Sequence, residues 1–173
     1  MLFVRATIFA CSLSLCVPAH TSAEQAPAPT FKSSELQVTV KRAKRNAAGQ
    51  LAISLLIENI AHENVALYGV DGAGVTTESG ETAEPSDVVG LPFCVASCQN
   101  PVSAVGVHVE PVVVEKDGSL LATYLFPGEG SKGACSLDLA VRLYLARLGS
   151  GTQPTHSLKW HQISIGLTNL SLC

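Results

Sequence analysis

The sequence lacks the motifs that mark the common enzyme classes. It contains no GxSxG nucleophile elbow, no HExxH metal-binding helix and no glycine-rich phosphate loop. It also has no paired-carboxylate motif on a recognisable scaffold. His108 and Glu110 come closest to an acid–base pair, but they are alternate residues of an expected strand and share its polar face. We therefore predict a non-catalytic protein without a cofactor.

Aromatic residues and methionine are scarce. Phe, Trp and Tyr make up 5% of the 173 residues, with a single tryptophan, so the stacking surface of a typical carbohydrate-binding platform is missing. Methionine is absent after Met1, which removes a frequent ligand of extracytoplasmic copper. The composition thus disfavours a sugar-binding module and a methionine-rich copper carrier.

Charge is also sparse, at 14% of residues. Outside residues 1–23 the chain has 14 acidic residues and 10 basic ones, because one of its 11 basic residues is Arg5. This mildly acidic balance gives no electrostatic basis for nucleic-acid binding. No long uncharged apolar run follows residue 23, so no transmembrane segment is expected after it.

Residues 1–23 have the layout of a secretory signal peptide. Arg5 precedes an apolar run that extends to about Val17, and small or short residues end the segment at Ala23. The run is short for a bilayer span, although a retained anchor or lipidation at Cys11 or Cys16 are alternatives. We predict cleavage after Ala23 and an exported protein, either periplasmic or secreted.

The remaining chain is expected to form a flexible leader over 24–34, with Pro27 and Pro29, and one domain over 35–173. Period-two alternation of apolar residues predicts strands over 36–41, 50–59, 65–70, 103–115, 119–126, 136–146 and 156–170. A change of phase predicts a bulge or an edge strand at Pro111, and a second bulge near His161. The fold class is therefore all-β. We expect an antiparallel two-sheet immunoglobulin-like β-sandwich of seven to eight strands, with a closed β-barrel as the alternative.

Four cysteines follow the signal segment, an even number that favours disulfides in an oxidising compartment. We predict that Cys94 pairs with Cys98, and that Cys135 pairs with Cys173. The second bond would fix residue 173 to the start of the 136–146 strand, beside which the last strand is expected to run.

A copper or zinc site on Cys94 and Cys98 is the alternative interpretation, since thiolate and imidazole suit these ions. The candidate histidines are His62, His108, His156 and His161. None lies at a ligand-like spacing from the cysteines, so no metal is predicted. A redox pair is disfavoured too, because the spacing is CxxxC and no βαβ pattern surrounds it.

Two segments concentrate charge of one sign. The run KRAKR over 41–45 places four positive charges at the end of a strand and in the turn after it, where they would discourage edge pairing. The acidic segment over 71–87 is expected to be a long loop and a candidate recognition site, through Asp71, Glu78, Glu81, Glu84 and Asp87. The favoured function is an exported binding or accessory protein that contacts a protein or cell-envelope partner through its loops. A small-ligand or metal carrier that uses the Cys94–Cys98 segment is the alternative.

Overall fold

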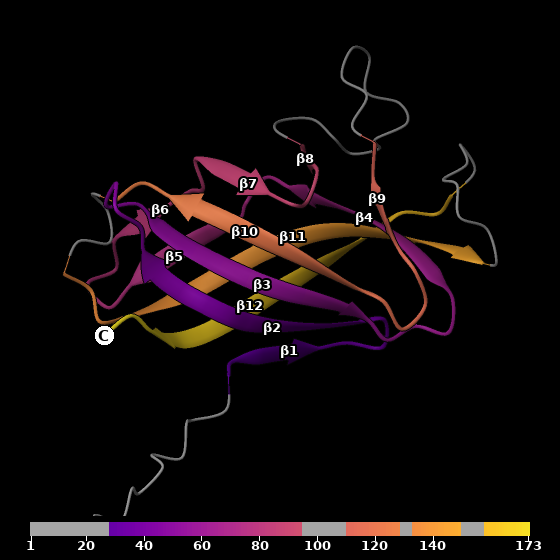
Figure 1. The fold of residues 1–173 in the computed structure, drawn as a ribbon, viewed down its shortest axis with the longest axis horizontal. Coiled ribbons are helices and arrows are strands. Elements are labelled where there is room, and N and C mark those ends of the chain that lie inside the picture. Colours follow the sequence, from indigo (N-terminus) through magenta and orange to yellow (C-terminus); the bar gives the residue numbers. More distant parts are fainter. Residues whose placement is uncertain (1–27, 95–109, 129–132, 150–157) are drawn as a thin grey trace, which may run out of the picture.

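A computed structural model describes residues 28–94, 110–128, 133–149 and 158–173, which fold into two β-sheets packed face to face (Figure 1). The first sheet has the order β1 (Thr30–Lys32), β2 (Leu36–Arg45), β3 (Leu51–Asn59), β10 (Ser119–Phe126), β7 (Asp87–Val89). The second sheet has the order β6 (Thr82–Ala83), β5 (Gly74–Thr77), β11 (Ser136–Gly149), β4 (Asn64–Val70), β8 (Phe93–Cys94). In addition, β12 (His161–Ser171) pairs with β11, and β9 (Val112–Val114) pairs with β4.

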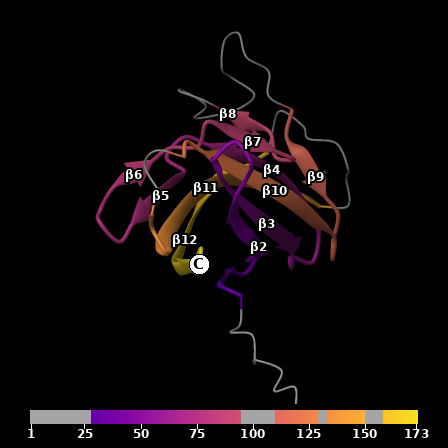
Figure 2. The same cartoon turned by 60° about the vertical axis from the view of Figure 1, so that its left-hand side comes forward.

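The strands form because apolar residues alternate along them and so fill one face. In β3, Leu51, Ile53, Leu55 and Ile57 are fully buried, and the residues between them are half-buried. The same alternation along β11 and β12 supplies the opposite wall of the core. Figure 2 shows β11 and β12 on one side of this core and β2 and β3 on the other. The architecture is the antiparallel immunoglobulin-like β-sandwich expected from the sequence; the two-residue pairing of β8 with β4 is parallel.

The longest strand, β11, organises the second sheet. On one side it pairs with β12, from Ser136 to Leu145. On its other side it pairs with β5 near its start and with β4 near its end. The chain therefore bends at residues 71–73, between β4 and β5. Both of these strands pair with the same side of β11, one after the other.

The structure adds short strands that no sequence pattern predicted. Residues 30–32 of the expected leader form β1, whose Phe31 packs against the core. The segment over 71–87, expected to be a long loop, contains β5, β6 and the start of β7. These strands have two to four residues each, and such lengths are too short for period-two alternation to reveal.

The bulge expected near His161 is not found there. β12 begins at His161, so the alternation that includes Trp160 belongs to the segment before the strand. The bulge lies farther along, where the register between β11 and β12 shifts between Leu137 and Leu139. Asn169 adopts a positive φ of 57° at this point, and its backbone N–H donates to Asp138 Oδ1 at 2.9 Å. This bulge lets both Leu167 and Leu170 face the core.

Some of the sequence predictions fall partly or wholly on residues outside the described ranges. Pro111 lies directly before β9, a three-residue edge strand that pairs with β4. Residues 103–109 of the strand expected there are outside the described residues, as are residues 1–27 and Cys98, so the signal segment and the bond between Cys94 and Cys98 stay predictions.

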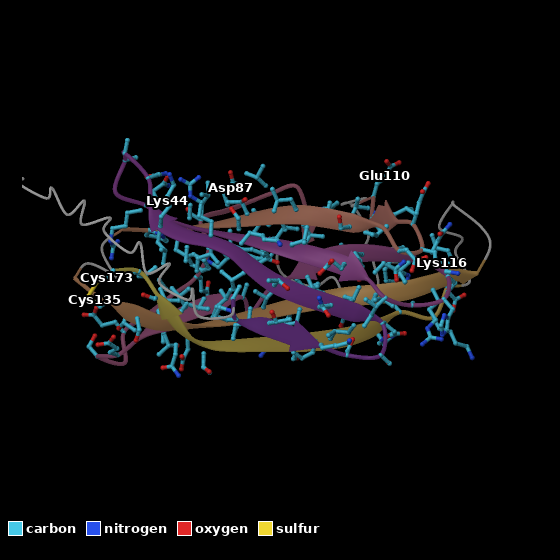
Figure 3. All side chains as sticks on the ribbon, turned by 60° about the horizontal axis from the view of Figure 1, so that its bottom comes forward. Lys44, Asp87, Glu110, Lys116, Cys135 and Cys173 are labelled. Carbon is cyan, nitrogen blue, oxygen red and sulfur yellow. A yellow bond between two sulfur atoms is a disulfide. The ribbon has the colours of Figure 1, made fainter. Side chains whose placement is uncertain are left out.

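The disulfide between Cys135 and Cys173 is confirmed, with the two Cα atoms 5.1 Å apart (Figure 3). It joins the residue directly before β11 to residue 173, which follows shortly after the end of β12. The bond therefore holds the paired strands β11 and β12 together at one end of the sandwich, as expected.

Gly90 fixes the approach of β7 to β10. Its φ is +85°, and a Cβ atom at this position would collide with the carbonyl oxygen of Leu121. Gly80, in the turn between β5 and β6, has a similar φ of +82° but no atom within 4 Å of the same position. Alanine substitutions at these two glycines therefore separate two costs in stability: the positive φ, which both share, and the close contact, which only Gly90 has of the two.

We expect Gly90→Ala to lower the free energy of unfolding more than Gly80→Ala does. Gly80→Ala should cost about 1 kcal/mol, from the positive φ alone. Gly90→Ala should cost about 2–4 kcal/mol, because β7 must also move away from β10. Urea denaturation of the two variants measures the difference, and equal losses would contradict this account of Gly90.

Candidate functional site

The outer face of the first sheet points away from the second sheet. Large apolar side chains are exposed on it, where polar residues are usual. Val89 and Leu121 are 54% and 55% exposed, which sets them apart from the other large hydrophobic residues in the described part of the chain. The strand register places Leu121 beside Leu56, and Leu125 beside Ala52. We call Ala52, Leu56, Val89, Leu121 and Leu125 the outer patch.

Polar residues inside the outer patch satisfy each other. Ser54 and Thr123 are register partners on β3 and β10, and their hydroxyl oxygens are 2.9 Å apart in a hydrogen bond. Because these hydroxyls bond to each other, each keeps one hydrogen-bond partner when the patch is covered. The face is thus suited to burial against another surface.

Charged residues border the outer patch on two opposite sides. Arg42 and Lys44 are exposed on β2, and Asp87 is exposed on β7. Lys44 pairs in register with Ala52, Ala52 with Leu125, and Leu125 with Asp87, so these four residues form one row across the sheet. Figure 3 shows Lys44 and Asp87 near the same end of the molecule.

The outer patch was not predicted from the sequence, although a signal for it is present. In an antiparallel strand with one solvated face, apolar residues should alternate with polar ones. The pairs Leu55-Leu56 and Leu120-Leu121 interrupt this alternation and place a leucine at a position of the outward face. The inward leucine of each pair is enough to predict its strand, so the strand assignment does not depend on the outward leucine.

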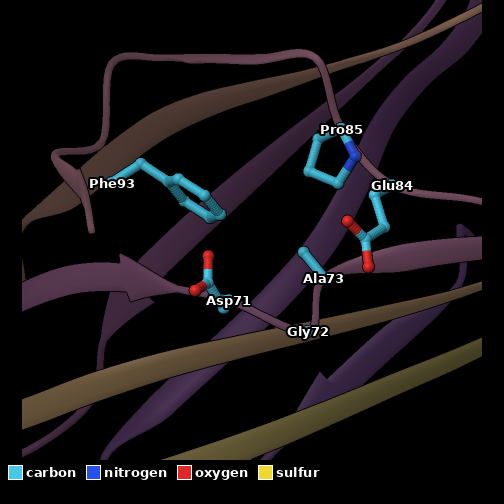
Figure 4. Close-up of a pocket in the computed structure, with 6 residues that line it drawn as sticks. All are labelled: Asp71, Gly72, Ala73, Glu84, Pro85 and Phe93. Atoms are coloured by element: carbon cyan, nitrogen blue, oxygen red, sulfur yellow. The ribbon is translucent and has the colours of Figure 1, made fainter. Parts of the chain in front are cut away.

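The acidic residues of the segment over 71–87 do not form one site. Glu78 and Glu81 lie at the turn between β5 and β6, whereas Asp87 borders the outer patch. Asp71 and Glu84 line a pocket of about 280 Å³ together with Pro85 and Phe93 (Figure 4). The structure therefore distributes the five carboxylates over three places.

A charged cluster connects the two sheets at one end of the sandwich. Glu35, in the turn between β1 and β2, has a side chain that is only 9% exposed. Arg147 Nε of β11 donates to Glu35 Oε1 at 2.7 Å, and His161 Nε2 of β12 lies 2.8 Å from Glu35 Oε2. Arg147 also approaches Glu63, at 3.5 Å. No sequence pattern indicated this cluster, because Glu35 is 112 residues from Arg147 and 126 residues from His161 along the chain.

Opposing effects act on the pKa of Glu35. Burial raises it, but hydrogen bonds and positive charge from Arg147 and His161 lower it more, so the pKa lies below the ordinary glutamate value. Glu35 in turn raises the pKa of Arg147 through the same hydrogen bond. The carboxylate form of Glu35 is therefore favoured in the folded state.

An aromatic cluster lies on the outer side of the second sheet. Tyr68 of β4 stacks on Tyr144 of β11, with ring centroids 5.3 Å apart, and meets the edge of Trp160 at 5.0 Å. Tyr68 is fully buried, and burial raises the pKa of its hydroxyl. Its ring consequently offers no open face for stacking a sugar, despite the local concentration of aromatic residues.

The metal alternative gains no support from the described residues. Within residues 28–94, 110–128, 133–149 and 158–173, no three His, Cys, Asp or Glu side chains are grouped closely enough to hold a metal ion. His161 instead contacts Glu35. Cys98, His108 and His156 lie outside these ranges. Over the same ranges, no helix has the length and apolar character needed to cross a membrane.

Comparison with known proteins gives distant matches among solved structures. No protein-family model and no curated protein sequence matches the chain. The GAE domain of yeast GGA1 is 11% identical, and the match covers 80% of this chain and 96% of that domain with a TM-score of 0.37. The ASH or PapD-like domain 7 of human CEP192 is 14% identical, and the match covers 88% of this chain and 98% of that domain with a TM-score of 0.33. At these identities the likeness does not extend to the residues of any site.

We expect the contribution of Glu35 to stability to depend on pH. Because its pKa is lowered by folding, the stabilisation is complete above the pKa of the unfolded state, about 4.3, and is lost as the pH falls through the folded-state value. Glu35→Gln should thus lower the free energy of unfolding at pH 7 by about 1–2 kcal/mol, a modest loss because solvent screens Arg147 and His161. At pH 3 the variant should approach the wild type.

Urea denaturation at the two pH values measures this change. Glu78→Gln is the matched control, because Glu78 is exposed in the β5–β6 turn and its substitution should have little effect at either pH. A gap between Glu35→Gln and the wild type that is the same at pH 7 and pH 3 would show that charge is not the basis of the cluster.

Proposed function

We propose that the chain is an exported, non-catalytic binding or accessory protein that contacts a protein partner, in the medium or in the cell envelope, through the outer patch. The observation that carries this proposal is the exposure of Val89 and Leu121, each over half exposed, on a sheet face that also presents Leu56 and Leu125. Exposed apolar residues that are grouped and bordered by charge are typical of interaction surfaces.

The proposed contact surface is a sheet face, whereas the sequence favoured contact through the loops. Of the acidic residues singled out by sequence, Asp87 remains part of the proposed surface, since it borders the outer patch on β7. A flat, regular sheet face suits a protein surface better than a small ligand, because small-molecule sites are concave and enclose most of their ligand.

Site-specific photo-crosslinking tests the binding surface. A photoreactive phenylalanine analogue replaces Leu121 in the protein expressed in its own host, and the adducts are identified by mass spectrometry. The matched control places the same analogue at Ser164, which is exposed on β12 of the second sheet. We expect discrete adducts from position 121 that are absent from position 164, whereas identical patterns from both positions would contradict the proposal.

Export is tested by the intact mass of the protein from its host, after alkylation without reduction. We expect a chain that begins at Glu24 and takes up no alkylating group, because the four remaining cysteines form two disulfides. Two added groups would mean that Cys94 and Cys98 are free thiols, since Cys135 and Cys173 are bonded to each other. A mass that includes residues 1–23 would contradict cleavage of the signal segment.

A further inference from the structure

The charges that border the outer patch cannot pair with each other within one chain. Lys44 lies on β2 and Asp87 on β7, and β3 and β10 run between them. Three spacings of about 4.8 Å separate the two strands by about 14 Å, well beyond the reach of a direct ion pair. Both residues are exposed in the part of the chain that the structure describes, so each charge can meet a surface that covers the patch.

We infer that this surface is a second copy of the chain, bound through the same face in a two-fold symmetric dimer. This inference rests on the proposed function, since it names the partner of the outer patch. A two-fold interface requires a surface that is complementary to itself, so that residue i meets residue j of the other copy and residue j meets residue i. The outer patch has this property.

The register of the first sheet shows which residues would meet. With the two-fold axis parallel to the strands and midway between β3 and β10, residues of one register row face the same row of the second copy in reverse order. In the row that contains Lys44 and Asp87, Lys44 faces Asp87 of the second copy and Ala52 faces its Leu125. Both charged pairs in the row are then of opposite sign.

The next two rows complete the interface. Ser54 faces Thr123 of the second copy, and both hydroxyls keep the hydrogen bond within their own chain. Arg42, in the same row, faces Val89, whose methyl groups can cover the aliphatic part of the arginine.

In the third row, Leu56 faces Leu121 of the second copy, which places the leucines of both copies together. The interface thus joins apolar contacts between β3 and β10 to charged contacts at its border. Sheets packed face to face with nearly aligned strands are the usual arrangement within β-sandwiches.

Charge reversal in the purified protein tests this geometry. Sedimentation over a range of concentrations gives the dissociation constant of the dimer. Lys44→Glu places a carboxylate against Asp87 of the second copy, and Asp87→Lys places an ammonium group against its Lys44. Each variant should therefore raise the dissociation constant about tenfold or more. Lys116→Glu makes the same charge change in the turn before β10, away from the patch (Figure 3), and should leave the constant unchanged.

The mixture of the two variants provides the sharpest result. In a mixed pair, the new carboxylate at position 44 of one chain faces the new ammonium group at position 87 of the other, and the unchanged Lys44 faces the unchanged Asp87. We therefore expect Lys44→Glu and Asp87→Lys to dimerise with each other although each dimerises poorly alone, and the double variant to dimerise like the wild type. A monomeric wild type, or charge variants that behave like Lys116→Glu, would overturn the inference.

The photo-crosslinking experiment keeps the two proposals apart. A crosslink at position 121 with twice the mass of the chain supports the dimer. A crosslink to a different protein, together with a monomeric purified chain, would overturn the dimer and leave the proposed binding surface standing. The absence of any adduct specific to position 121 would remove both.

Discussion

The second sheet depends on β11, because β4, β5 and β12 all pair with this one strand. β12 occupies one side of this strand, while β4 and β5 share the other. Its inward residues, from Leu137 to Leu145, are buried against the first sheet. The ends of β11 are also fixed, by the disulfide at Cys135 and by the contact of Arg147 with Glu35. A change that shifted β11 by one residue would expose its whole buried face and break both attachments.

The long strands were predictable from the sequence because each buries one face. Alternation of period two identified β2, β3, β4, β10, β11 and β12, and the two-sheet architecture followed from their number and from the absence of helical periodicity. The strands β5 and β6 could not be found in this way, since β5 pairs with the part of β11 that β4 does not reach, and β6 pairs with β5. The bulge in β12 likewise involves two strands, since Asn169 adopts the positive φ and Asp138 of β11 accepts its backbone N–H.

The candidate surface was less predictable than the fold. Charged and cysteine-containing segments were the natural places to expect function, because loops and titratable groups carry most sites. The outer patch instead consists of apolar residues at the outward positions of regular strands, such as Leu56 and Leu121. Their proximity follows only from the register between β3 and β10. Glu35, Arg147 and His161 illustrate the same limit, since their encounter requires both sheets to be in place.

The edge of β2 that β1 does not cover has a consequence for self-assembly of a different kind. β1 pairs only with residues 37–39 of β2, so the following part of that edge is not covered by β1. Lys41, Arg42 and Lys44 are exposed there, and a bulge between Val40 and Arg42 interrupts the regular ladder. An incoming strand from another molecule would have to pair with a bulged backbone and lie beside these cationic side chains. The charges and the bulge of β2 therefore disfavour amyloid-type strand addition along this part of the edge.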